Sequence, residues 1–270
     1  MSSPAPTIPR PLPFWRAVGA SYMTVVRNLG QLARISWLWL VILLPVSAAV
    51  QWLIWPWTNE VAQREGGTTA ELIGYLPDII ELPVLASIAV AWHRLVLHQE
   101  RMHSAFYLRL DRLVLRYTLI VLAFFVLVLV PEVYAIFLLK DAVDNLLAVA
   151  AASINIAIVV LASIFVLPRF SLVLPGIAVG ENLSLAGAWR LTRRNTWRLA
   201  MATLACSLPL VAPFAFLMWY FPRTTRTSMA LTMTLNTLVY VLIVTVGVTL
   251  LSLAYRHFVW RQDIGAPPSA

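Results

Sequence analysis

Three carboxylates lie in or beside long apolar runs of this sequence, and they are the residues most able to do chemistry there. Ionisable groups inside a membrane are energetically costly, so each is a functional candidate. Asp78 and Glu81 follow Pro77, and Glu132 follows Pro131. Together the three carboxylates could form an outer vestibule that holds a cation or a lipid amine. Alternatively, Asp78 and Glu81 stabilise the first turns of a helix that begins at Pro77.

An amide and several imidazoles complete the polar groups of the apolar runs. Asn155 lies in the middle of one run and could line a central cavity, although such an amide more often links two packed helices. His93, His98 and His103 are spaced by five residues, whereas two metal ligands share one helix face at spacings of three or four. The sequence therefore predicts no metal site and no cofactor.

Four arginines have the chemistry to bind phosphate. A guanidinium group is planar and always charged, and it matches a phosphate with two parallel hydrogen bonds. Arg27, Arg190 and Arg194 lie in basic amphipathic segments and Arg169 directly follows the fourth predicted span, and we expect all four to contact lipid headgroups. The alternative is that these arginines only set the membrane topology and extend their side chains to the interface.

Signatures of catalysis and of nucleic-acid binding are missing from the sequence. It contains no HExxH, GxSxG, Walker or dinucleotide-binding motif. A nucleic-acid-binding protein would need a soluble basic face or a stacking module, and neither is visible. We therefore expect a protein that is not an enzyme, with membrane lipids rather than nucleic acid as its partner.

Composition and apolar runs predict an all-α, polytopic transmembrane bundle. Hydrophobic residues make up 60% of the 270 residues and charged residues 12%, about half the ~25% that is usual in soluble domains. An apolar run of about 18 residues or more can cross the membrane as a helix. We expect one transmembrane domain over residues 14–262, with disordered tails at 1–13 and 263–270. Its six spans are predicted at residues 35–57, 77–97, 117–139, 146–168, 199–221 and 230–255.

The distribution of basic residues predicts the orientation. Of the 20 lysines and arginines, all but four lie on one side of the predicted spans. The four on the other side are Arg64, Lys140, Arg223 and Arg226. Because positively charged loops stay in the cytoplasm, we expect both termini to be cytoplasmic, which requires an even number of spans.

The segments that precede the odd-numbered spans indicate a threefold repeat of one amphipathic helix and one hairpin of two spans. Basic stripes occur in residues 14–34, 109–116 and 190–198, and each unit has a proline 18 or 19 residues after an arginine. An amphipathic helix with such a stripe lies in the headgroup plane. The alternative is that every polytopic protein alternates basic segments with apolar runs, without any repeat.

Residues 169–198 resemble a family of six-span bacterial inner-membrane proteins. In that family an Arg-aromatic pair leads to a proline, an acidic turn and a helix of small residues with a basic end. The matching positions here are Arg169-Phe170, Pro175, Glu181 and 186–194, and the segments RNLGQLARISW and AWHRLVLHQE are also similar. The family comprises YciC-like proteins and the membrane domain attached to some glycerophosphodiester phosphodiesterases. The resemblance implies a bacterial inner-membrane location but no activity, because the phosphodiesterase reaction belongs to a soluble domain.

Taken together, these patterns predict a multi-pass protein of the bacterial cytoplasmic membrane that engages anionic lipid headgroups at the inner leaflet. The alternative function is a small-solute or lipid transporter with a central cavity between the three hairpins. A transporter should place Glu132 or Asn155 on the wall of that cavity.

Overall fold

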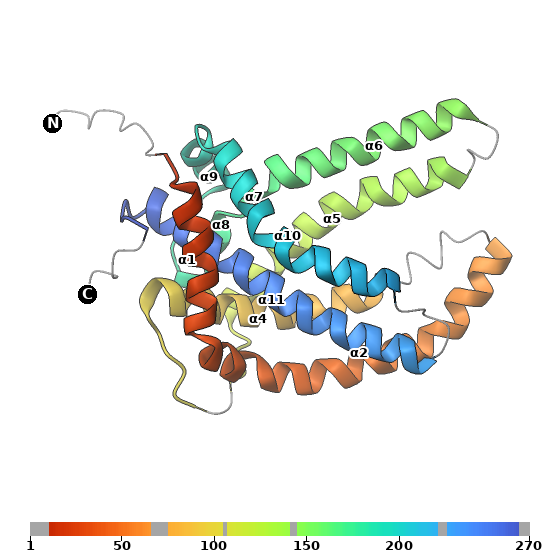
Figure 1. Cartoon of the computed structure of the whole chain (residues 1–270), viewed down its shortest axis with the longest axis horizontal. Coiled ribbons are helices and arrows are strands. Elements are labelled where there is room, and N and C mark those ends of the chain that lie inside the picture. The colour runs from red at the N-terminus through yellow and green to blue at the C-terminus, as the bar shows by residue number, and fades with distance from the viewer. Residues whose placement is uncertain (1–10, 66–74, 105–106, 141–144, 221–225, 265–270) are drawn as a thin grey trace.

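The computed structural model describes residues 11–65, 75–104, 107–140, 145–220 and 226–264, and this part of the chain is helical without any strand. Long helices run between the two ends of the molecule and are joined as hairpins (Figure 1). These helices are α2 (Leu29–Glu65), α4 (Leu76–His98), α5 (Arg112–Lys140), α6 (Leu146–Phe165), α10 (Thr196–Tyr220) and α11 (Arg226–Phe258). The prediction of an all-α fold is therefore confirmed.

Over the described residues, five helical stretches are long and apolar enough to cross a membrane. They are Leu29–Val50, Asp78–His98, Arg112–Ala135, Leu146–Val179 and Leu235–Phe258. The chain is thus a multi-pass membrane protein, and five of the six predicted spans have counterparts. The counterpart of the first begins six and ends seven residues earlier than predicted, the fourth extends to Val179, and the ends of the other three differ by at most five residues. Helix α10 runs beside them but is not one of the five (Figure 1). The crossing at α10 therefore stays a prediction.

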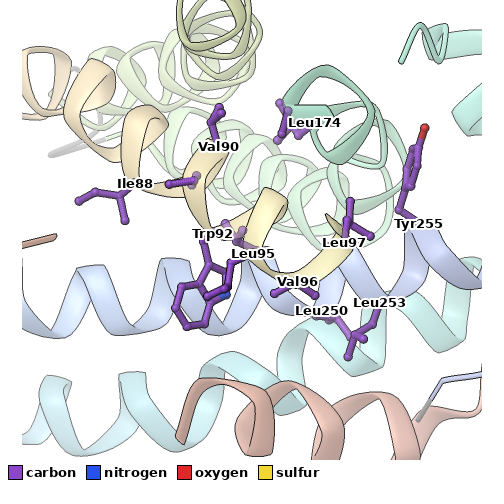
Figure 2. Packing of buried hydrophobic residues seen from close by; sticks show 14 of the residues in the cluster. Ile88, Val90, Trp92, Leu95, Val96, Leu97, Leu174, Leu250, Leu253 and Tyr255 are labelled. Atoms are coloured by element: carbon purple, nitrogen blue, oxygen red, sulfur yellow. The ribbon is translucent and has the colours of Figure 1, made fainter. Parts of the chain in front are cut away.

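Helix α4 is the centre of the bundle. In its most apolar stretch 72% of the residues are buried inside the protein, whereas the corresponding values are 11% for α5 and 6% for the run that begins with α6. Figure 2 shows why: α4 directs Trp92 towards α11, and Leu174 approaches it from α8 (Val173–Val179). Because α5 and α6 leave their apolar surface open, lipid rather than protein must cover it.

Short helices gather at one end of the bundle, which we call the basic end. Helix α1 (Phe14–Arg27) packs across α10 and α11 there, and α7 (Leu167–Phe170), α8 and α9 (Leu185–Thr192) lie at the same end of the molecule (Figure 1). The start of α1 and the end of α11 both lie at this end. The hydroxyl of Ser184 accepts a hydrogen bond from the N–H of Gly187 and so caps α9, at the start that the sequence predicted.

The predicted tails lie mostly outside the described residues, but their inner ends pack against the bundle. Leu12 is 1% exposed; its N–H donates to the Oδ1 atom of Asn195, and its carbonyl accepts from Arg198. At the other end of the chain, Ile264 is also buried. The packed structure thus begins before residue 14 and extends past residue 262.

The second interfacial helix that the sequence predicted is not formed as a separate element. Arg112 and Arg116 belong to the first turns of α5, and residues 99–104 and 107–111 are not helical. The reason is that Asp111 caps α5 directly: its Oδ1 atom accepts from the N–H groups of Leu113 and Val114. The stripe of arginines therefore continues into the spanning helix.

The first and third predicted units resemble each other in two places. Asn28 lies between α1 and α2, and Asn195 lies between α9 and α10; each N–H bonds the carbonyl three residues before it. At the exits of α4 and α11, Gln99 and Arg261 both adopt φ 55°, a conformation that residues other than glycine seldom take. The following N–H then bonds the carbonyl of Arg94 or Arg256, six residues back. These parallels support a relation between two units, and the threefold repeat stays a prediction.

Candidate functional site

A cavity of about 300 Å³ lies at the basic end, between α1 and the last turns of α4 and α11. This volume is at the lower limit of small-molecule sites, which span about 300–1,000 Å³. Arg27 and Arg256 line the cavity, together with the polar residues Thr24, Asn28 and Gln99. The remaining lining is apolar and consists of Ala20, Met23, Leu95, Val96 and Leu253. The lining contains no carboxylate, so the cavity is suited to an anion.

Local structure explains how the two arginines come to this cavity. Arg27 is the last residue of α1, and Ala17, Ser21 and Val25 bury the opposite face of that helix. Their small side chains let α1 approach α10 and α11 closely. Arg256 lies in the last turn of α11 and is 5% exposed. In the sequence Arg256 is only one of the basic residues that set the topology, because nothing local distinguishes it from its neighbours.

Arg169, which we expected to contact lipid, is held inside the protein. It is 7% exposed, and its guanidinium lies 3.3 Å above the centroid of the Trp189 ring. Its Nε atom donates to the hydroxyl of Thr192 at 3.1 Å, and a terminal nitrogen donates to the carbonyl of Trp189 at 2.7 Å. The ring of Phe170 also stacks against Trp189, with the two centroids 5.2 Å apart. These contacts give Arg169 a structural role: it fastens α9 to α7.

The other two predicted headgroup contacts lie apart from the cavity. Arg190 and Arg194 are exposed, Arg190 on α9 and Arg194 just after it. Neither lines the cavity of Arg27 and Arg256. The structure thus separates the four arginines of the sequence prediction into one in the cavity, one inside the protein and two on the surface of the basic end.

The residues of the predicted outer vestibule fall on different helices. Asp78 is exposed in the first turn of α4 and Glu81 is buried one turn later, with Tyr240 of α11 close to both. Glu132 is exposed on α5. The side-chain amide of Asn155 donates to the carbonyl of Pro131 at 2.5 Å and thereby links α6 to α5. The first-turn position of Asp78 and the interhelical role of Asn155 match the alternatives to a vestibule.

A buried polar network was not foreseen from the sequence. His93 is fully buried, and its Nδ1 atom lies 2.7 Å from the Ser252 hydroxyl and its Nε2 atom 3.2 Å from the Tyr117 hydroxyl. The Ser252 hydroxyl also donates to the carbonyl of Val248, so a consistent arrangement has the imidazole donating through Nδ1 and accepting through Nε2. This chain of hydrogen bonds joins α5, α4 and α11. Adjacent in sequence, Trp92 donates to Thr249 at 2.7 Å.

An ion pair between Arg109 and Asp111, beside the start of α5, makes the folding stability of the protein depend on pH. Burial opposes ionisation of Asp111, but hydrogen bonds from Arg109 and from two backbone N–H groups outweigh it and lower the pKa of Asp111. A carboxyl whose pKa is lowered on folding adds stability above its unfolded pKa, and this stability is lost as pH falls through the folded pKa. Asp111→Asn lacks this contribution, so we expect the variant to be less stable than the wild type at neutral pH. The difference between their free energies of unfolding should shrink as pH falls below about 4. Thermal unfolding at stepped pH measures this, and a deficit that does not change with pH would contradict it.

Comparison with protein-family models, with curated proteins and with solved structures finds no match to this chain.

Proposed function

We propose that this chain is an integral protein of the bacterial cytoplasmic membrane that engages anionic lipid headgroups at the inner leaflet. In this proposal α10 is the sixth crossing, and the basic end faces the cytoplasm. The support comes from one observation: the exposed residues Arg27, Arg190 and Arg194 belong to the basic end, where α1 packs across α10 and α11 (Figure 1). An amphipathic helix in that position lies at headgroup level, and each basic residue near an anionic surface contributes about 1 kcal/mol. The resemblance to YciC-like proteins remains part of the proposal.

Transport is the weaker alternative. Of the two residues expected on the wall of a central cavity, Asn155 is engaged with the Pro131 carbonyl, and Glu132 is exposed on α5. Neither lines the Arg27–Arg256 cavity or a second, largely apolar cavity of about 430 Å³ between α5 and α8. No feature of these cavities favours a path across the membrane.

The proposal is tested by comparing the thermal stability of the protein in nanodiscs of phosphatidylglycerol and of phosphatidylcholine. We expect a higher unfolding temperature in the anionic lipid, and a smaller difference when Arg190 and Arg194 are both replaced by glutamine. Arg226→Gln, at the opposite end of α11, is the matched control and should keep the difference. Equal stability in both lipids, or an equal loss in the control, would refute the engagement of headgroups by the basic end. A reporter fused after Ala270 that is active only in the periplasm would refute the orientation.

A further inference from the structure

We infer that the cavity lined by Arg27 and Arg256 is a discrete, one-to-one binding site for a phosphate group. This inference rests on the proposed function, because it assigns a specific ligand class to the end of the protein that faces the headgroups. The first observation behind it is the composition of the lining: two guanidinium groups, the amide of Asn28 and the hydroxyl of Thr24, without an aspartate or glutamate. Such a set provides hydrogen-bond donors and positive charge and lacks any negative counterpart.

The second observation is the state of Arg256. The residue is only 5% exposed, and its Nε atom is enclosed and has no hydrogen-bond partner within the described residues. A buried donor without a hydrogen-bond partner is unfavourable, so proteins normally pair such a group or give it a ligand. Other arginines at the basic end are paired: Arg94 with Glu100, and Arg109 with Asp111, both at 2.6 Å. Arg256 differs from both in facing a cavity instead of a carboxylate.

The third observation is that the other donors of the cavity are already held in place. The Asn28 side-chain amide donates to the carbonyl of Thr24 at 2.8 Å, which fixes this residue at the end of α1. The Gln99 side-chain amide donates to the carbonyls of Leu95 and Val96 at 3.4 and 3.5 Å, so it fixes the end of α4 and leaves Arg27, Arg256 and Asn28 to supply donors to a ligand. A site whose donors are fixed before binding loses little conformational entropy when the ligand enters. Arg27, which is exposed, can close over the bound anion from the outside.

The chemistry also indicates which phosphate compounds fit. A phosphate that carries no positive group, such as phosphatidic acid or inorganic phosphate, meets only favourable charges in this cavity. A choline headgroup would bring a quaternary ammonium next to two arginines, with no carboxylate in the lining to receive it. The phosphate group is the shared feature, and it can come from a lipid headgroup or from solution.

The test uses the full-length protein in a neutral detergent and a phosphate-free buffer. The probes are inorganic phosphate, dihexanoyl phosphatidic acid and dihexanoyl phosphatidylcholine, and the measurement is the unfolding temperature as a function of probe concentration. We expect saturable stabilisation by at least one of the first two probes and a weaker effect of phosphatidylcholine. Stabilisation by phosphatidic acid alone identifies a lipid source, and stabilisation by inorganic phosphate alone identifies a soluble one.

Substitutions locate the site. Arg256→Gln and Arg27→Gln should each weaken binding by roughly tenfold to a hundredfold, the usual worth of a charge-assisted hydrogen bond. Arg27 is exposed, so we expect Arg27→Gln to fold normally even if the protein does not tolerate a substitution at the buried Arg256. Arg16→Gln, on the same helix but outside the cavity, should bind as the wild type does.

The inference is overturned if neither phosphate probe stabilises the wild type, if both cavity variants bind normally, or if Arg16→Gln loses as much as they do. The proposed function can survive that result, because its own test depends on Arg190 and Arg194 in nanodiscs. If anionic nanodiscs still stabilise the protein while the cavity variants behave as the wild type, the headgroup proposal stands and the discrete site does not exist.

Discussion

Replacing His93 by alanine should lower the free energy of unfolding by about 3 kcal/mol. The side chain is completely buried between α4, α5 and α11, and its removal leaves a cavity and two hydroxyl groups without their imidazole partner. Interhelical hydrogen bonds in membranes contribute only about 0.6 kcal/mol each, whereas truncation of a large buried side chain costs about 2–5 kcal/mol. The loss of packing therefore outweighs the loss of hydrogen bonds. Unfolding in mixed micelles, followed by tryptophan fluorescence, measures the change.

Two further variants separate the contributions at His93. His93→Phe keeps a ring of similar size and removes the hydrogen bonds to Ser252 and Tyr117, so we expect a loss of about 1 kcal/mol. His98→Ala, five residues further along α4, removes an exposed imidazole and should change stability by less than about 0.5 kcal/mol. If His93→Ala has the same free energy of unfolding as the wild type, the network does not hold the three helices together.

Substitution of Arg169 by glutamine should cost about 3 kcal/mol of stability without weakening the response to anionic lipid. The guanidinium loses its contact with the Trp189 ring, worth about 0.5–2 kcal/mol, and its hydrogen bonds to Thr192 and the Trp189 carbonyl. Arg169→Lys keeps the charge but not the planar donors, and we expect an intermediate loss. The measurements are the unfolding midpoint and the difference between the two nanodisc lipids.

A matched substitution of an exposed arginine distinguishes a structural role of Arg169 from a role in lipid binding. Arg190→Gln, on the exposed side of α9, should leave the stability in neutral detergent nearly unchanged and reduce the response to phosphatidylglycerol. The opposite pattern, in which Arg169→Gln is as stable as the wild type but insensitive to lipid charge, would restore Arg169 as a headgroup contact.

The prediction of five of the membrane-crossing segments depended on local sequence. Leu235–Phe258 and Asp78–His98, for example, fall within a few residues of the predicted spans because hydrocarbon has a fixed thickness and accepts only long apolar helices. Local chemistry also indicated where α9 begins, since a serine before a run of small residues is a good helix cap. The prediction of a separate second interfacial helix was wrong for an equally local reason, because Asp111 caps α5.

The sequence alone thus determined that the chain is helical, that it enters the membrane repeatedly, and that its arginines gather at one end. Only the tertiary structure decided which arginine is enclosed by Trp189 and which one meets Arg27 across a cavity. The physical reason is that hydrophobicity fixes where a helix crosses but not how it is rotated about its axis. That rotation depends on packing between α1, α4 and α11, segments far apart in the chain, and it determines which polar side chains face one another.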